Sequence, residues 1–213
     1  NTYGGGLASF GSTHALTLNQ SLIDSNLAGY GGGLYIVGAP VTLNGSQLTD
    51  NNAIGSFLSS GIGGGAYIAN ASPASVSIHD GAITGNRAAD AAGMYVSGGR
   101  LQLANTQVMS NVANSVGLFS GNGGGVSFVG SNPANDNGSI SDSLFLSNTA
   151  TSGGGLYLSN IALTLTHTSL IGNSAGDGAA ILLGNGQLTG ADNVITHNPA
   201  VYNGGGLSLS NAQ

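Results

Sequence analysis

The sequence predicts an all-β solenoid, a parallel β-helix in which short strands stack along a rod. Three observations indicate this fold. A tripeptide N-x-A returns at seven equivalent positions of a repeat, apolar and small polar residues alternate around it, and no segment shows the 3.6-residue period of a helix. A repeat of this length indicates stacked units, because a single unit cannot bury its own apolar face.

The N-x-A tripeptide sets the period of the repeat. Its Asn residues are separated by 25, 35, 25, 37, 25 and 25 residues, so the unit has 25 residues and two units carry insertions of 10 and 12. The seven positions are Asn26, Asn51, Asn86, Asn111, Asn148, Asn173 and Asn198. Ala stands two places after each of them, which suits a tight corner that faces the core.

Three short runs in each unit alternate apolar and small polar residues, which is typical of strands with one buried face. The apolar position three residues before each Asn is occupied by Ile23, Leu48, Ile83, Val108, Phe145, Leu170 and Ile195. A second apolar position lies eight residues before each Asn, with Gly190 as its exception, and a third follows each glycine run. Three strands in about 25 residues correspond to one coil of a parallel β-helix.

The whole chain, residues 1–213, is therefore predicted to be one β-helix domain of seven full coils and part of an eighth. We expect a right-handed, single-stranded helix, since parallel crossovers are right-handed in nearly all proteins. The recurring Asn suits a turn with left-handed dihedrals, and Asn residues stacked in register predict an amide ladder. The glycines allow the sharp bend into the next strand.

Composition excludes several functions. The chain has 213 residues, two cations (Arg87 and Arg100), eight Asp, no Lys, Glu or Cys, and a net charge of -6. Without a basic patch we expect no nucleic-acid partner, and without Cys there is no disulfide or thiolate site. No apolar run approaches the roughly 20 residues of a membrane-spanning helix. We expect no cofactor and no metal site.

Two insertions of similar sequence lie at the same corner, near 54–62 and 114–122, and longer turns follow near 69–75 and 130–137. Loops on a rigid scaffold often carry function, and these place apolar residues in Gly- and Ser-rich surroundings. Phe57 and Leu58 in the first insertion, and Leu118 and Phe119 in the second, are therefore candidate contact residues. They either fold back over the rod or face a partner.

One outward column is aromatic. The position between the two apolar residues after the glycine run is Tyr in four units, Tyr35, Tyr67, Tyr95 and Tyr157. Such a column is a candidate contact surface for sugar rings or for another protein, or it simply stabilises the sheet. A second row, Asp142, His167 and Asp192, falls on consecutive coils and is a weaker candidate for acid–base chemistry or cation binding.

The motifs GG[AL] and [FI]xxN, as in "GGGLYI", "FLSN" and "ITGN", resemble the repeats of polymorphic outer-membrane proteins and related bacterial autotransporter passengers. This resemblance implies secretion, display on a bacterial cell surface and adhesion. We expect a non-catalytic, extracellular structural rod or filament segment that contacts proteins or glycans.

The alternatives are a carbohydrate-active β-helix enzyme and a glycan-binding module. Pectate-lyase-like enzymes use a basic residue beside clustered acids, and this chain has no Lys. Neither end shows an atypical capping repeat, so we expect the rod to continue in a longer chain or to self-associate end to end or laterally.

Overall fold

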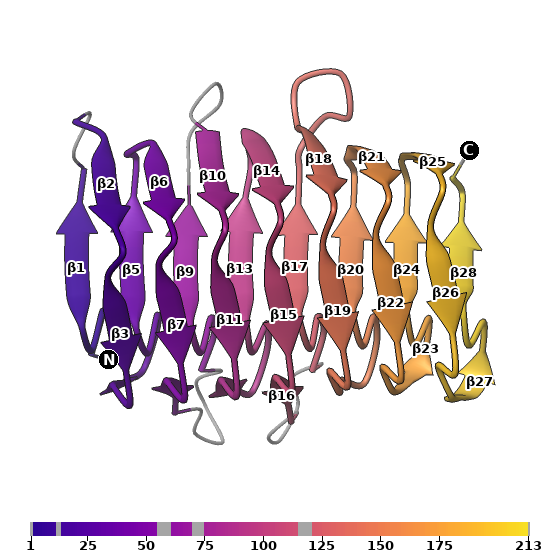
Figure 1. The fold of residues 1–213 in the computed structure, drawn as a ribbon, viewed down its shortest axis with the longest axis horizontal. Helices are drawn as coiled ribbons and strands as arrows, with labels where there is room; N and C mark the ends of the chain where they lie inside the picture. Colours follow the sequence, from indigo (N-terminus) through magenta and orange to yellow (C-terminus); the bar gives the residue numbers. More distant parts are fainter. Residues whose placement is uncertain (1, 12–13, 55–60, 70–74, 115–120, 213) are drawn as a thin grey trace.

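The computed structural model describes residues 2–11, 14–54, 61–69, 75–114 and 121–212. The described residues are all-β, and their strands repeat at regular spacing in long parallel sheets, consistent with a parallel β-helix or solenoid. The strands lie side by side along the long axis, with the two termini at opposite ends (Figure 1). None of the described residues belongs to a helix that is long and apolar enough to cross a membrane.

Three long sheets run the length of the rod. The first sheet contains β1 (Leu7–Phe10), β5 (Leu34–Val37), β9 (Ala66–Ala69), β13 (Met94–Ser97), β17 (Val126–Val129), β20 (Leu156–Ser159), β24 (Ile181–Gly184) and β28 (Leu207–Ser210). The second contains β2 (Leu16–Asn19), β6 (Val41–Asn44), β10 (Ser75–His79), β14 (Arg100–Ala104), β18 (Asn137–Ser141), β21 (Ala162–Thr166) and β25 (Gln187–Ala191). The third contains β3 (Leu22–Asp24), β7 (Gln47–Thr49), β11 (Ala82–Thr84), β15 (Gln107–Met109), β19 (Leu144–Leu146), β22 (Ser169–Ile171) and β26 (Val194–Thr196).

Short strands also form at the N-x-A tripeptide, which the alternation pattern did not predict. They are β4 (Leu27–Ala28), β8 (Asn52–Ala53), β12 (Arg87–Ala88) and β16 (Val112–Ala113), with β23 (Ala175–Asp177) and β27 (Ala200–Asn203) as a separate pair. Two-residue strands are too short to show any periodicity in the sequence. Their small Ala side chains pack together at the corner, where Ala53, Ala88 and Ala113 are buried in a cluster of their own.

The core lies between the sheets and is built from the predicted apolar columns. Leu48, Ile83, Val108 and Phe145 are fully buried on neighbouring strands of the third sheet. Both insertions leave the register intact, since Tyr35 pairs with Tyr67 across the 54–62 insertion and Tyr95 pairs with Ser127 across the 114–122 insertion. Alternation within each strand therefore decides which side chains face the core and which face solvent.

The turns differ from the prediction that the repeated Asn adopts left-handed dihedrals. Positive φ occurs instead at the residue just before it, as at Ser25 (56°), Asp50 (50°) and Ser110 (55°). The Asn side chains point inward, where Asn51 and Asn86 are fully buried. The left-handed residue turns the chain, and the following Asn can then use its amide inside the rod.

Ala91 occupies a left-handed position (φ 52°) at which neighbouring units carry glycine, such as Gly63 (φ 71°) and Gly123 (φ 61°). A residue with a Cβ pays about 1 kcal/mol to adopt this conformation, and glycine does not. Glycine also makes the unfolded chain more flexible, which offsets part of this gain, so Ala91→Gly is expected to raise the free energy of unfolding by about 0.5 kcal/mol. Urea unfolding measures the change. Gly31→Ala is the matched control and should destabilise the protein, because its added Cβ would meet the Leu34 carbonyl oxygen. A destabilised Ala91→Gly variant would contradict this expectation.

Candidate functional site

The outward column of the first sheet carries a stack of tyrosines. Tyr35, Tyr67 and Tyr95 are direct register partners on β5, β9 and β13. The ring centroids of Tyr35 and Tyr67 lie 4.9 Å apart with planes 9° from parallel, and those of Tyr67 and Tyr95 lie 5.1 Å apart at 17°. The ring spacing follows the strand spacing of about 4.8 Å, so the parallel sheet holds the phenols face to face.

Three further aromatic residues join this stack. The ring of Tyr3 lies 4.8 Å from that of Tyr35 and 5.6 Å from that of Tyr30, Phe10 lies 5.1 Å from Tyr35, and Tyr30 meets Tyr67 edge-on at 6.0 Å. We call these six residues the aromatic patch: Tyr3, Phe10, Tyr30, Tyr35, Tyr67 and Tyr95. The first three were not predicted from the sequence. A signal was present, because Tyr3 and Tyr30 each stand directly before a glycine run.

The geometry of the patch decides which atoms a partner can reach. Both faces of the Tyr67 ring are covered, one by Tyr35 and the other by Tyr95, so solvent meets ring edges rather than ring faces in the middle of the stack. Tyr3 and Phe10 lie at the open end and are 42% and 61% exposed. The patch thus offers an apolar surface bordered by hydroxyl groups, which suits amphipathic partners.

Burial changes the acidity of the phenols. Burial, together with the smaller effect of the neighbouring Tyr95 and Tyr35 phenols, raises the pKa of Tyr67 to about 12. The pKa of Tyr35 is also raised, chiefly by burial. The Tyr35 and Tyr67 hydroxyl groups therefore remain protonated at neutral pH and can donate hydrogen bonds as well as accept them.

Tyr157 belongs to the same column but is separated from the patch. Ser127 on β17 lies between Tyr95 and Tyr157 in the register, and its side chain is buried. Asp90 lies near both tyrosines, and its carboxylate oxygen accepts a 2.6 Å hydrogen bond from the backbone N–H of Asn122. Burial raises the pKa of Tyr95 and of Tyr157, and the negative charge of Asp90 raises both further.

Asp90 is a half-buried acid whose charge is costly at neutral pH. Burial raises its pKa to about 6, although backbone hydrogen bonds from Asn122 and Ala91 act in the opposite direction. The folded pKa of Asp90, about 6, lies above the unfolded value of about 3.9. The protonated acid therefore stabilises the folded state fully below pH 3.9, and this stabilisation is lost as the pH rises through about 6.

Asp90→Asn is therefore expected to raise the free energy of unfolding by about 1–2 kcal/mol at pH 7.5 and to leave it nearly unchanged at pH 3.9. Urea unfolding at the two pH values measures this difference. Asp50→Asn, at an exposed turn, serves as the control and should have little effect at either pH. An Asp90→Asn effect of equal size at both pH values would show that charge is not the cause.

The loop candidates cannot be placed on this surface. Phe57, Leu58, Leu118 and Phe119 lie outside the described residues. Of the two longer turns, the one near 130–137 is described. It is organised by Asp136, whose carboxylate accepts hydrogen bonds from the backbone N–H groups of Ser131 (2.6 Å), Asn132 (3.0 Å) and Gly99 (2.7 Å) and from the Ser131 hydroxyl (3.0 Å).

The environment of Asp136 affects its pKa in two opposite ways. Burial alone would raise the pKa of this carboxyl, but the four hydrogen bonds outweigh burial and hold the pKa below its usual value.

The repeated Asn residues form a continuous amide ladder inside the rod. Each amide oxygen from Asn51 to Asn198 accepts hydrogen bonds of 2.9–3.1 Å from the backbone N–H and the side-chain NH₂ of the Asn in the preceding unit. The NH₂ groups of Asn51 to Asn198 each also donate to a backbone carbonyl of the preceding unit at 2.8–3.0 Å. These amides satisfy buried backbone groups, which is a structural role.

The acid–His–acid row is brought only partly together. His167 Nε2 lies 3.6 Å from a carboxylate oxygen of Asp192, with both side chains more than half exposed. Among the described residues no ion pair joins Asp142 to His167, and no three His or acidic side chains are grouped so that they could hold a metal ion. An ion pair this exposed contributes little stability.

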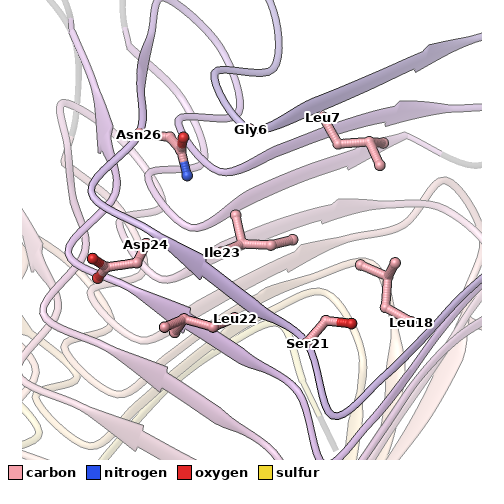
Figure 2. A pocket seen from close by; sticks show the side chains of 8 residues that line it. All are labelled: Gly6, Leu7, Leu18, Ser21, Leu22, Ile23, Asp24 and Asn26. Carbon is pink, nitrogen blue, oxygen red and sulfur yellow. The ribbon is translucent and has the colours of Figure 1, made fainter.

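A hollow of about 410 Å³ lies at the end of the core nearest the N-terminus. Figure 2 shows Leu7, Leu18 and Ile23 pointing toward the common interior, with Asn26 above Ile23. These side chains pack against the buried core of the following units. Ser21, Asp24 and Asn26 also line the hollow, which continues the apolar core at this end of the described residues.

Comparison with protein-family models, curated proteins and solved structures returned no match for this chain. Its function is therefore inferred from the fold and from the geometry of its surface.

Proposed function

We propose that this protein is a non-catalytic, extracellular rod, displayed on a bacterial surface, that adheres to glycans through the aromatic patch. The rod would be a right-handed β-helix of seven full coils and part of an eighth, as the repeat period predicts. The resemblance to autotransporter passengers supports a surface location. The aromatic patch carries the adhesive part of the proposal, since it is a wide apolar face on a chain with few charges.

A glycan fits this surface better than a charged partner does. Sugars combine apolar C–H faces with hydroxyl groups, and the patch combines exposed ring surface at Tyr3 and Phe10 with protonated phenols at Tyr35 and Tyr67. No charged side chain belongs to the patch, so recognition would rest on apolar contact and neutral hydrogen bonds.

A glycan array with the purified protein tests this function. The double variant Tyr3→Ser, Phe10→Ser removes the most exposed rings while leaving the stacked ones, and it should weaken binding at least about tenfold. Tyr202→Ser is the matched control, because Tyr202 is 77% exposed and belongs to β27, which lies near the opposite end of the rod (Figure 1). Absence of glycan binding, or equal binding by the double variant, would refute the proposal and leave a protein partner as the other use of this face.

The absence of catalysis is part of the proposal and has its own assay. The exposed His167–Asp192 pair is the nearest approach to an acid–base arrangement among the described residues. Release of reducing ends from polygalacturonate or alginate would contradict a non-catalytic role and favour the carbohydrate-active alternative.

Self-association is a further part of the proposed assembly. The Asn ladder has a direction, because each amide oxygen accepts from the preceding unit, so copies could extend it only head to tail. Sedimentation velocity over a hundredfold range of concentration tests this arrangement, and a single monomeric species throughout would rule it out.

A further inference from the structure

A second surface hollow lies on the second sheet, away from the aromatic patch. Its volume is about 380 Å³, and it is centred on three neighbouring strands, β10, β14 and β18. The outward side chains form two rows in register, Ser75, Arg100 and Asn137 in one and Ser77, Gln102 and Ser139 in the other. We call these six residues the arginine pocket. Val76 and Leu101 alternate with them and are buried beneath.

Among the described residues that line this pocket, Arg100 is the one with a charged side chain. It is exposed and forms no ion pair with any described residue. The neighbouring acid, Asp136, is fully buried, and its carboxylate is occupied by three backbone N–H groups and the Ser131 hydroxyl. The guanidinium therefore has its hydrogen-bond donors available for a ligand on a protein whose net charge is -6.

The other five side chains of the pocket are neutral and polar. Ser75, Gln102 and Ser139 are exposed, while Ser77 and Asn137 are half-buried. Ser77 already bonds the ring nitrogen of His79 at 2.7 Å, and its contact with Gln102 is long, at 3.5 Å. The pocket thus offers hydroxyl and amide groups on both sides of one cation, a pattern suited to a ligand that carries one anionic group and several hydroxyls.

We propose that the arginine pocket binds an acidic sugar, a pyranose ring that carries a carboxylate. The Arg100 guanidinium would pair with the carboxylate through two parallel hydrogen bonds, while the Ser, Gln and Asn side chains would bond the ring hydroxyls. A hollow of this size accommodates a sugar ring rather than an isolated carboxylate group. A single cation is too little for a nucleic acid, whose binding depends on many phosphate contacts.

This proposal goes beyond adhesion through the aromatic patch, because it rests on different residues and a different sheet. If the Tyr3 and Phe10 variants failed to affect glycan binding, the proposed site at Arg100 would be unaffected. If the Arg100 variant failed to affect acidic-sugar binding, the proposed contact through the aromatic patch would be unaffected. Arg87 provides an internal control. It is the second arginine of the chain, is exposed, and lies on β12 at another face of the rod.

The test follows the two arginine side chains by NMR. A chain with only two arginines has two Nε–Hε resonances, which Arg87→Lys and Arg100→Lys would assign. Trigalacturonate should shift the Arg100 resonance in a saturable manner and leave the Arg87 resonance nearly unchanged. The methyl ester of the same trisaccharide, which is neutral, and sodium acetate, which lacks the sugar, should each bind at least about tenfold more weakly.

Calorimetry on two variants completes the test. Arg100→Gln should weaken trigalacturonate binding at least about tenfold, whereas Arg87→Gln should bind as the unaltered protein does. Both residues are exposed, so both variants should keep the thermal midpoint of the parent protein. The proposal is overturned if trigalacturonate does not bind, if the ester or acetate binds equally well, or if the two variants lose affinity to the same extent.

Discussion

Asn111→Ala is expected to lower the free energy of unfolding by about 3–6 kcal/mol, because it removes a central rung of the buried amide ladder. The Asn111 amide oxygen accepts from the backbone N–H and the NH₂ group of Asn86 at 3.0 and 2.9 Å. Its NH₂ group donates to the Ile83 carbonyl and to the Asn148 amide oxygen, both at 2.9 Å. Ala would leave several of these groups buried without a partner, and each costs about 1–3 kcal/mol.

The matched control for this rung is Asn198→Ala. Asn198 makes the same kind of contacts to Asn173 and Leu170, but it is half-buried rather than fully buried, so water can replace part of what is lost. Its replacement should cost about 1 kcal/mol. Urea unfolding measures both variants. Equal decreases in the free energy of unfolding would mean that burial does not determine how much an Asn of the ladder stabilises the protein.

Phe145→Ala is expected to lower the free energy of unfolding by about 3–5 kcal/mol, the usual cost of a large cavity in a core. Phe145 on β19 is fully buried between Val108 and Leu170, its register partners on β15 and β22. The ring lies against Gly125, where an added Cβ would be 3.3 Å from the ring Cδ1 atom. Neighbours held this closely on a regular sheet have little freedom to fill the space.

Phe10→Ala provides the comparison for the core variant, because Phe10 is 61% exposed at the edge of the aromatic patch. Removing its ring should cost less than about 1 kcal/mol. Urea unfolding measures both free energies. The slope of the free energy of unfolding against urea concentration, which reports the surface exposed on unfolding, is compared between the two variants. A Phe145→Ala loss below 1 kcal/mol would show that the core around β19 can collapse onto the cavity.

Sequence periodicity was sufficient for the parallel, all-β architecture and for the composition of the core. The apolar residue three places before each Asn was predicted to face inward, and Leu48, Val108 and Leu170 are fully buried, whereas Ile195 of the last unit is 40% exposed. This prediction succeeded because a solenoid repeats one local pattern, and each strand needs only its alternation to determine which side faces the core.

The turns could not be predicted in the same way. The sequence pattern assigned left-handed dihedrals to the repeated Asn, yet residues such as Ser25 and Asp50 adopt them. Asn tolerates that conformation and also satisfies buried backbone groups, so its recurrence is compatible with either use. The amide contacts between units show that the second use applies.

The repeat alone thus accounts for the rod, its inward columns and one outward column of tyrosines, since each follows from residues 25 to 37 apart that share one position in the unit. The surface sites required the folded chain. Tyr3 and Tyr30 join Tyr35 because two columns meet at one bend of the coil, and Arg100 gains its neutral neighbours only when β10, β14 and β18 align. Periodicity specifies which residues share a column, whereas ring orientation, burial and unpaired charge depend on contacts between columns that a one-dimensional pattern does not contain.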